Sequence, residues 1–177
     1  HVRPQRRLQH HLHSESRFQQ RAVVEDVAAG PPNWRVTAIP VGGEFPEGID
    51  LSPDGREVRT ATRNDGGVSI IDVGTKEVVQ RLDLNLTDPN RLQFTPDGWR
   101  VLIADGAGSS LVVLDAAART EITRFDLAPN AVLVHPDGSR AYAALRGGNS
   151  VAVIDLDTLD AAGQIPTGLG SGPGCMC

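Results

Sequence analysis

The sequence predicts an all-β fold built from repeated four-stranded units, because three short patterns recur in it with matched spacing. The turn sequence Pro-Asp-Gly occurs at residues 53–55, 96–98 and 136–138, at intervals of 43 and 40 residues. An apolar run ending in aspartate recurs in the same register, at 68–72, 111–115 and 151–155. A proline opens each unit, at Pro46, Pro89 and Pro129, and again at Pro173. Patterns that shift together indicate an internal repeat of one structural unit.

Each unit is predicted to contain four short strands. In the first unit they are residues 48–52, 57–62, 68–73 and 78–84, separated by turns rich in Pro, Asp, Asn and Gly. The third strand is apolar on both alternating faces, as expected of a strand buried on two sides. The units lack the 3.6-residue apolar period of a helical solenoid. A four-stranded unit of about 40–45 residues matches one blade of a β-propeller.

The repeat sets the predicted boundaries of a partial propeller at residues 34–177. Its blades span about 46–88, 89–128 and 129–172, and part-blades flank them, since 35–42 resembles a last strand and 173–176 a first one. Propellers close with 4–8 blades, so we expect a fragment of an incomplete ring. The remaining blades would come from sequence beyond this chain or, as the alternative, from a second copy. Residues 1–33 match no repeat and are predicted to be a disordered or artefactual basic leader, in which 17–27 could form a short helix.

Composition excludes several classes of protein. The 177 residues are 40% apolar and contain no apolar run near the 18 residues of a transmembrane helix. The formal charge is −5; five arginines and one glutamate lie in residues 1–24, so the rest carries −9. An acidic body with 4% aromatic residues disfavours nucleic-acid binding. Only Cys175 and Cys177 are present, at the end of the chain, where they cannot cross-link the fold.

The first repeat resembles the YVTN-repeat β-propellers. It reads Pro-Glu-Gly-Ile-Asp-Leu-Ser-Pro-Asp-Gly at 46–55, followed by Val-Ser-Ile-Ile-Asp at 68–72, Thr75, Val78 and Val79. The resemblance covers residues 35–177. The second strand departs from the name-giving pattern in all three repeats, at residues 58–62, 101–105 and 141–145. Ala118 also replaces the threonine found at Thr75 and Thr158.

The resemblance implies a propeller fold and a bacterial or archaeal protein that is periplasmic or secreted. It implies no single activity, because the family is functionally mixed. Similar propellers serve as binding scaffolds, as lactonase-like hydrolases and as scaffolds of redox enzymes.

Aspartates that recur in every repeat are expected to serve the fold. Three lie in the Pro-Asp-Gly turns, where aspartate can accept hydrogen bonds from nearby backbone amides. Three more end the third strands and can cap the turn that follows. The six residues are Asp54, Asp97, Asp137, Asp72, Asp115 and Asp155.

Functional residues are instead expected where the repeats differ, in the loops at one mouth of the central channel. The loops before each first strand and those between the second and third strands form this mouth. The predicted ligand-binding set is mixed in charge: Glu47, Arg63, Asn64, Asn90, Arg91, Asp105, Asn130, Arg146 and Asn149. Such a set could hold a polar ligand or the loop of a protein partner, although ordinary solvated loops would look the same.

No catalytic constellation appears in the sequence. It contains no Gly-x-Ser-x-Gly elbow, no His-Glu-x-x-His motif and no Cys-x-x-Cys pair. His10, His11 and His13 lack the surroundings that support a metal site. We therefore predict a non-enzymatic binding or interaction scaffold without cofactor or metal. The alternative is a lactonase-like hydrolase or a redox-enzyme accessory propeller, with Glu47, Asp88 and Asp105 placed to contribute acidic ligands.

Overall fold

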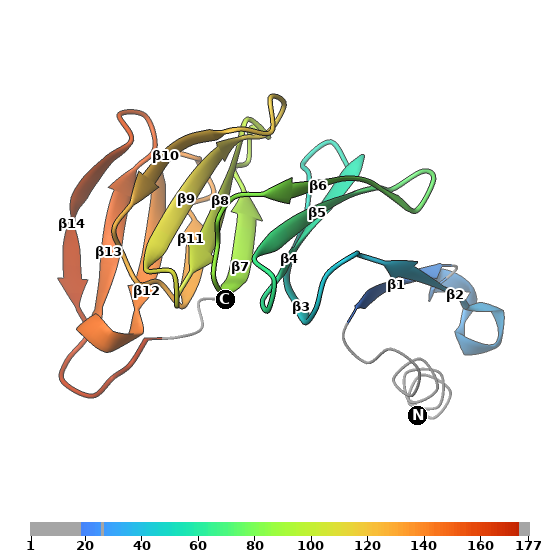
Figure 1. The fold of residues 1–177 in the computed structure, drawn as a ribbon, viewed down its shortest axis with the longest axis horizontal. Coiled ribbons are helices and arrows are strands. Elements are labelled where there is room, and N and C mark those ends of the chain that lie inside the picture. Colours follow the sequence, from blue (N-terminus) through green and yellow to red (C-terminus); the bar gives the residue numbers. More distant parts are fainter. Residues whose placement is uncertain (1–18, 26, 174–177) are drawn as a thin grey trace.

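The computed structural model describes residues 19–25 and 27–173, except for the side chains of Ala29 and Arg146. As predicted, the fold is all-β, with three four-stranded antiparallel sheets (Figure 1). Blade 1 consists of β3 (Pro46–Leu51), β4 (Glu57–Thr62), β5 (Gly67–Asp72) and β6 (Glu77–Asp83). Blade 2 consists of β7 (Pro89–Phe94), β8 (Arg100–Asp105), β9 (Ser110–Asp115) and β10 (Glu121–Phe125). Blade 3 consists of β11 (Ala131–Val134), β12 (Arg140–Leu145), β13 (Ser150–Asp155) and β14 (Asp160–Pro166).

The core lies between the blades. Side chains alternate along a strand, so β8 presents Val101 and Ile103 to blade 1 but Leu102 and Ala104 to blade 3. All four are fully buried. Burial on both faces explains the continuous apolar runs of the central strands. The first strands β3, β7 and β11 contact one another in sequence, as strands around a shared axis do.

The Pro-Asp-Gly turns have the structure that their sequence predicts. Gly55, Gly98 and Gly138 have φ values of 73°, 76° and 78°. This left-handed conformation favours glycine because it has no Cβ. In each turn the aspartate accepts a backbone N–H two residues on, from Arg56, Trp99 and Ser139. The aspartates ending the third strands accept N–H groups of Thr75, Ala118 and Thr158. The predicted structural role of all six is confirmed.

The segment before blade 1 differs from the sequence-based expectation. Residues 20–25, placed within a disordered or helical leader, form strand β1 (Gln20–Glu25), which pairs antiparallel with β2 (Arg35–Pro40). Two short 3₁₀ turns, η1 (Val27–Ala29) and η2 (Pro31–Asn33), join them. Val23 and Ile39 pack against Ile71 on the face of blade 1 that blade 2 does not cover. The expectation is wrong here because burial of this sheet face stabilises a strand that lacks the repeat pattern. Residues 1–18, with their histidines, lie outside the described residues.

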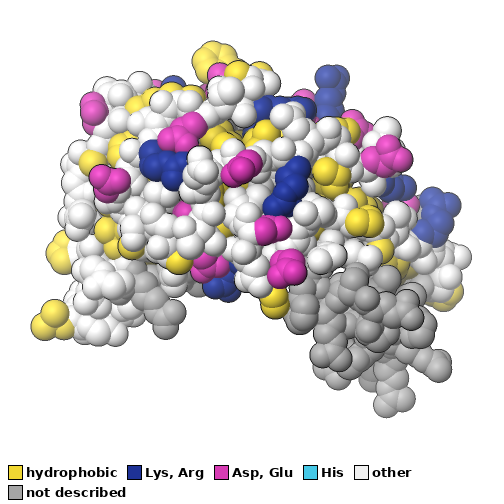
Figure 2. Space-filling model, in the orientation of Figure 1, with side chains coloured by type: hydrophobic (Ala, Val, Ile, Leu, Met, Phe, Trp, Pro, Cys, Tyr) yellow, Lys and Arg dark blue, Asp and Glu magenta, His cyan; other side chains and the backbone are white. Residues whose placement is uncertain are grey.

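Three blades leave the ring open in this structure (Figure 1). Strand β14 forms one edge, and all of its residues are exposed. Basic and acidic side chains are interspersed over the face shown in Figure 2. Within the described ranges, no helix has the length and apolar character needed to cross a membrane.

Candidate functional site

Each blade has two ends, which the chain topology distinguishes. The mouth end carries the loops before each first strand and the turns between second and third strands. The turn end carries the Pro-Asp-Gly turns and the turns between third and fourth strands. The predicted ligand-binding residues belong to the mouth end, and hydrogen bonds join its two kinds of loop, such as Asn64 Nδ2 to Glu44 Oε2 at 3.3 Å.

Asp105 supports the loops at the mouth through hydrogen bonds to their backbone. Its side chain ends β8 and is fully buried. The carboxylate accepts the backbone N–H groups of Thr87 and Asp88 at 2.8 Å each, and that of Gly108 at 3.0 Å. A Cβ on Gly108 would lie 2.0 Å from Asp105 Oδ2, so the loop approaches the carboxylate as closely as glycine permits. This carboxylate therefore joins two loops and has no room for a ligand.

Four other mouth residues form an ion-pair network between blades 1 and 2. Arg63 holds Asp88 with two hydrogen bonds, from Nε to Oδ1 at 2.5 Å and from Nη2 to Oδ2 at 2.8 Å. Its Nη1 donates to Glu47 Oε2 at 2.9 Å. Arg91 Nη1 donates to the other oxygen of Glu47 at 2.7 Å. Both carboxylates are thus paired through both oxygens, and the four formal charges cancel.

The pKa directions agree with this pairing. The hydrogen bond from Arg63 holds the pKa of Asp88 below its ordinary value, against the opposing effect of burial. Burial would raise the pKa of Glu47, but hydrogen bonds from Arg91 and Arg63 outweigh it and lower that pKa. Asp88 in turn raises the pKa of Arg63. Asp88, Glu47 and Arg63 are therefore charged near neutral pH.

The remaining predicted residues lie at the same end. Arg91 Nη1 also donates to the backbone carbonyl of Asn90 at 2.7 Å. Asn90 is half-buried in β7, and its Oδ1 has no hydrogen-bond partner among the described residues. Asn149 ends the 3₁₀ turn η3 (Arg146–Gly148), and its Oδ1 accepts the N–H of Gly172 at 3.4 Å. Asn130 donates its backbone N–H to the Ala144 carbonyl. The backbone of Arg146 lies in η3, and its side chain is not described.

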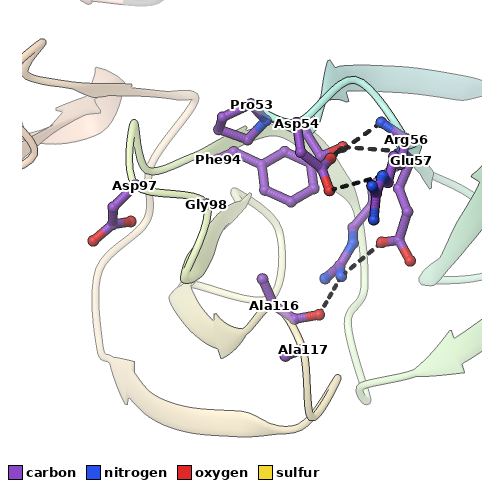
Figure 3. A pocket seen from close by; sticks show the side chains of 11 residues that line it. Pro53, Asp54, Arg56, Glu57, Phe94, Asp97, Gly98, Ala116 and Ala117 are labelled. Atoms are coloured by element: carbon purple, nitrogen blue, oxygen red, sulfur yellow. Dashed lines mark hydrogen bonds and ion pairs between the residues drawn. The ribbon is translucent and has the colours of Figure 1, made fainter.

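Sequence reasoning missed a cavity at the turn end. A cavity of about 390 Å³ lies between blades 1 and 2, lined by both Pro-Asp-Gly turns, Glu57, Arg59, Phe94 and Ala116 (Figure 3). Arg59 is a large buried cation in β4, with a side chain only 1% exposed. It takes the position that Leu102 and Tyr142 hold in the other blades. This difference between repeats is the signal in the sequence that distinguishes Arg59.

Known proteins resemble this chain in their fold. No family model matches the chain, and no curated protein does. Among solved structures, hydrazine synthase of Kuenenia stuttgartiensis is 27% identical, with a TM-score of 0.66 over 73% of this chain and 37% of that chain. A functionally unknown protein from Desulfotomaculum acetoxidans is 15% identical, with a TM-score of 0.72 over 85% and 50%. The β-propeller domain of Cps50 (Swd1) from Myceliophteria thermophila is 15% identical, with a TM-score of 0.70 over 86% and 53%.

These similarities place the chain among β-propellers. It spans about half the length of two of these structures and less of the third. The resemblance to YVTN-repeat propellers stays a prediction, since no family model matches.

At the mouth, Glu47 and Asp88 are paired with arginines, Asp105 accepts backbone N–H groups, and Glu44 accepts a hydrogen bond from Asn64. Among residues 19–25 and 27–173, no group of three His, Cys, Asp or Glu side chains could hold a metal ion.

Proposed function

We propose that this chain is a non-enzymatic propeller scaffold that binds a protein partner or polar ligand at its mouth end. One observation carries the proposal: at the mouth, polar side chains from blades 1 and 2 form one network, in which Glu47 accepts hydrogen bonds from Arg63 and Arg91. Ion pairs between the arginines and carboxylates hold the loops in place. The exposed polar atoms of these side chains can still form hydrogen bonds with a partner. Arg63 and Arg91 keep 41% and 42% of their side chains exposed. Preorganised polar loops on a rigid sheet are a common basis of recognition.

The test identifies a partner and then maps its contact. Proteins retained by the purified chain from an extract of its source cells are identified, produced in pure form and measured by calorimetry. Charge changes Asn64→Asp and Arg146→Glu, combined, are expected to weaken the complex on the order of tenfold. Arg56→Glu, at the turn end, is the matched control and should bind as wild type. Equal affinity of all three proteins, or no binding by any purified candidate, would contradict the proposal.

The second candidate function is an accessory propeller of a redox enzyme. The observation favouring it is the 27% identity with hydrazine synthase, higher than that with the other two structures. Under this proposal the partner retained in the extract carries a redox cofactor, which its absorbance spectrum reveals. A partner without any such cofactor contradicts it and leaves the general scaffold proposal intact.

We also propose a periplasmic or secreted location, which rests on the resemblance to YVTN-repeat propellers. Fractionation of source cells with an antibody against the chain tests it. Detection in the cytoplasmic fraction alone would contradict it.

A further inference from the structure

The cavity at the turn end contains an incompletely paired buried cation. Arg59 carries five N–H groups, and only Nη2 has partners, the Ala116 carbonyl at 2.5 Å and Glu57 Oε2 at 3.1 Å. Nε and Nη1 are buried without a hydrogen-bond partner among the described residues. Buried polar groups are nearly always paired, because an unpaired one has lost its water and gained nothing. Nε and Nη1 of Arg59 therefore lack a hydrogen-bond acceptor in this part of the structure.

The neighbouring carboxylates are already engaged by other groups. Asp54 accepts hydrogen bonds from the Ser52 hydroxyl and the Arg56 N–H (Figure 3). Asp97 accepts them from the Thr95 hydroxyl and the Trp99 N–H. Glu57 has a second cation, since Arg119 Nη2 donates to its Oε1 at 2.5 Å. Glu57 can thus release Arg59 and remain paired with Arg119. Its departure would free one N–H of Arg59 Nη2, next to the unpaired Nε and Nη1.

The rest of the lining is apolar. Phe94 lies beneath the guanidinium, 5.1 Å from ring centroid to Cζ, and Pro53, Ala116 and Ala117 complete the wall. A second cavity of about 250 Å³ adjoins it through Gly98 and Ala117 and is lined by Trp99 and Ile122. Trp99 is 74% exposed, so an aromatic surface borders the cavity. Cavities of this size hold small ligands.

We propose that this cavity binds a small organic monocarboxylate with an apolar body, its carboxylate on Arg59 and its body against Phe94 and the Ala116–Ala117 wall. Arg59 matches a carboxylate because the planar guanidinium donates two parallel hydrogen bonds to it. A dianionic phosphate fits less well, since three carboxylates line the same cavity. This site lies at the opposite end of the blades from the proposed mouth function and is independent of it.

The test is calorimetric titration of the full chain with benzoate, supported by NMR. Wild type should bind benzoate in the millimolar range, while benzamide, the uncharged isostere, and inorganic phosphate should bind on the order of tenfold more weakly. Arg59→Leu introduces the residue that blade 2 has at this position and should abolish binding. Glu57→Gln removes the competing carboxylate and should strengthen binding severalfold.

Two controls keep the outcome decisive. Arg56→Gln removes an exposed arginine of the same cavity and should leave benzoate affinity within about twofold, since Arg56 carries no buried donor. Amide spectra show whether each variant is folded; if Arg59→Leu is not, the opposite effect of Glu57→Gln still tests the site. Absence of benzoate binding, equal binding by Arg59→Leu, or weaker binding by Glu57→Gln would overturn the proposal.

Discussion

The arginines at the two ends of the interface between blades 1 and 2 differ in exposure and in hydrogen bonding. At the mouth, Arg63 pairs with Asp88 and Glu47 through three hydrogen bonds while 41% of its side chain stays exposed. At the turn end, the side chain of Arg59 is 1% exposed, yet two of its nitrogens have no hydrogen-bond partner among the described residues. A side chain that differs between repeats can thus have all its hydrogen bonds within the fold, or it can keep donors that a ligand could bind. Which of the two holds depends on the hydrogen-bond partners and burial of the side chain. The position of the residue in the sequence does not determine it.

The largest effect should come from removing the buried carboxylate at the mouth. Asp105→Ala leaves three backbone N–H groups without their acceptor, and we expect it to lower the free energy of unfolding by about 2–4 kcal/mol. Urea denaturation measures this loss. Asp126→Ala, an exposed aspartate nearby in sequence, is the control and should change stability by less than about 0.5 kcal/mol. A small loss for Asp105→Ala would mean that these loops do not depend on it.

A smaller effect is expected from the paired arginine at the mouth. A double-mutant cycle of Arg63→Gln and Asp88→Asn should give a coupling of about 1 kcal/mol, because the pair is doubly hydrogen-bonded but partly exposed. The matched cycle at the turn end, Arg56→Gln and Asp54→Asn, joins side chains 85% and 60% exposed at 4.0 Å and should give nearly none. Equal coupling energies in the two cycles would contradict the claim that ion pairing is stronger at the mouth than at the turn end.

The smallest effect is a pH dependence of stability. The folded-state pKa values of Asp88 and Glu47 are lowered, so their contribution is present above the unfolded-state values near about 4 and is lost as pH falls through the folded ones. The free energy of unfolding, measured by urea denaturation from about pH 6 to pH 3, should therefore fall more steeply for wild type than for Arg63→Gln. Parallel curves for the two proteins would show that Arg63 does not stabilise these carboxylates.

Much of the fold could be predicted because the repeat itself encodes it. The period fixed the four-stranded unit, and the alternation at residues 101–104 anticipates a strand buried on both faces. Strand β1 was missed because it has no Pro-Asp-Gly turn beside it. Its sequence Val23-Val24-Glu25-Asp26 carries a shortened form of the apolar run ending in aspartate, 46 residues before Asp72, and could have revealed it.

The candidate site was harder to predict because hydrogen bonding is not visible in a single sequence. Asp105 differs from Thr62 and Leu145 at the same position, which made it a candidate ligand, yet its carboxylate bonds backbone N–H groups of its own blade and the preceding loop. Arg59 differs from Leu102 and Tyr142 in the same way. Only the three-dimensional structure separates a side chain whose bonds are complete from one whose bonds are not.

The most direct test of the contrast compares Arg59→Leu with Arg63→Leu in urea denaturation. Arg63→Leu breaks a satisfied network and should lower the free energy of unfolding by about 1–2 kcal/mol. Arg59→Leu removes a buried, partly unpaired cation and leaves Glu57 paired with Arg119, so stability should stay unchanged or rise by about 1 kcal/mol. Losses of similar size in both variants would contradict the account, because they would show that Arg59 is as fully engaged in the fold as Arg63.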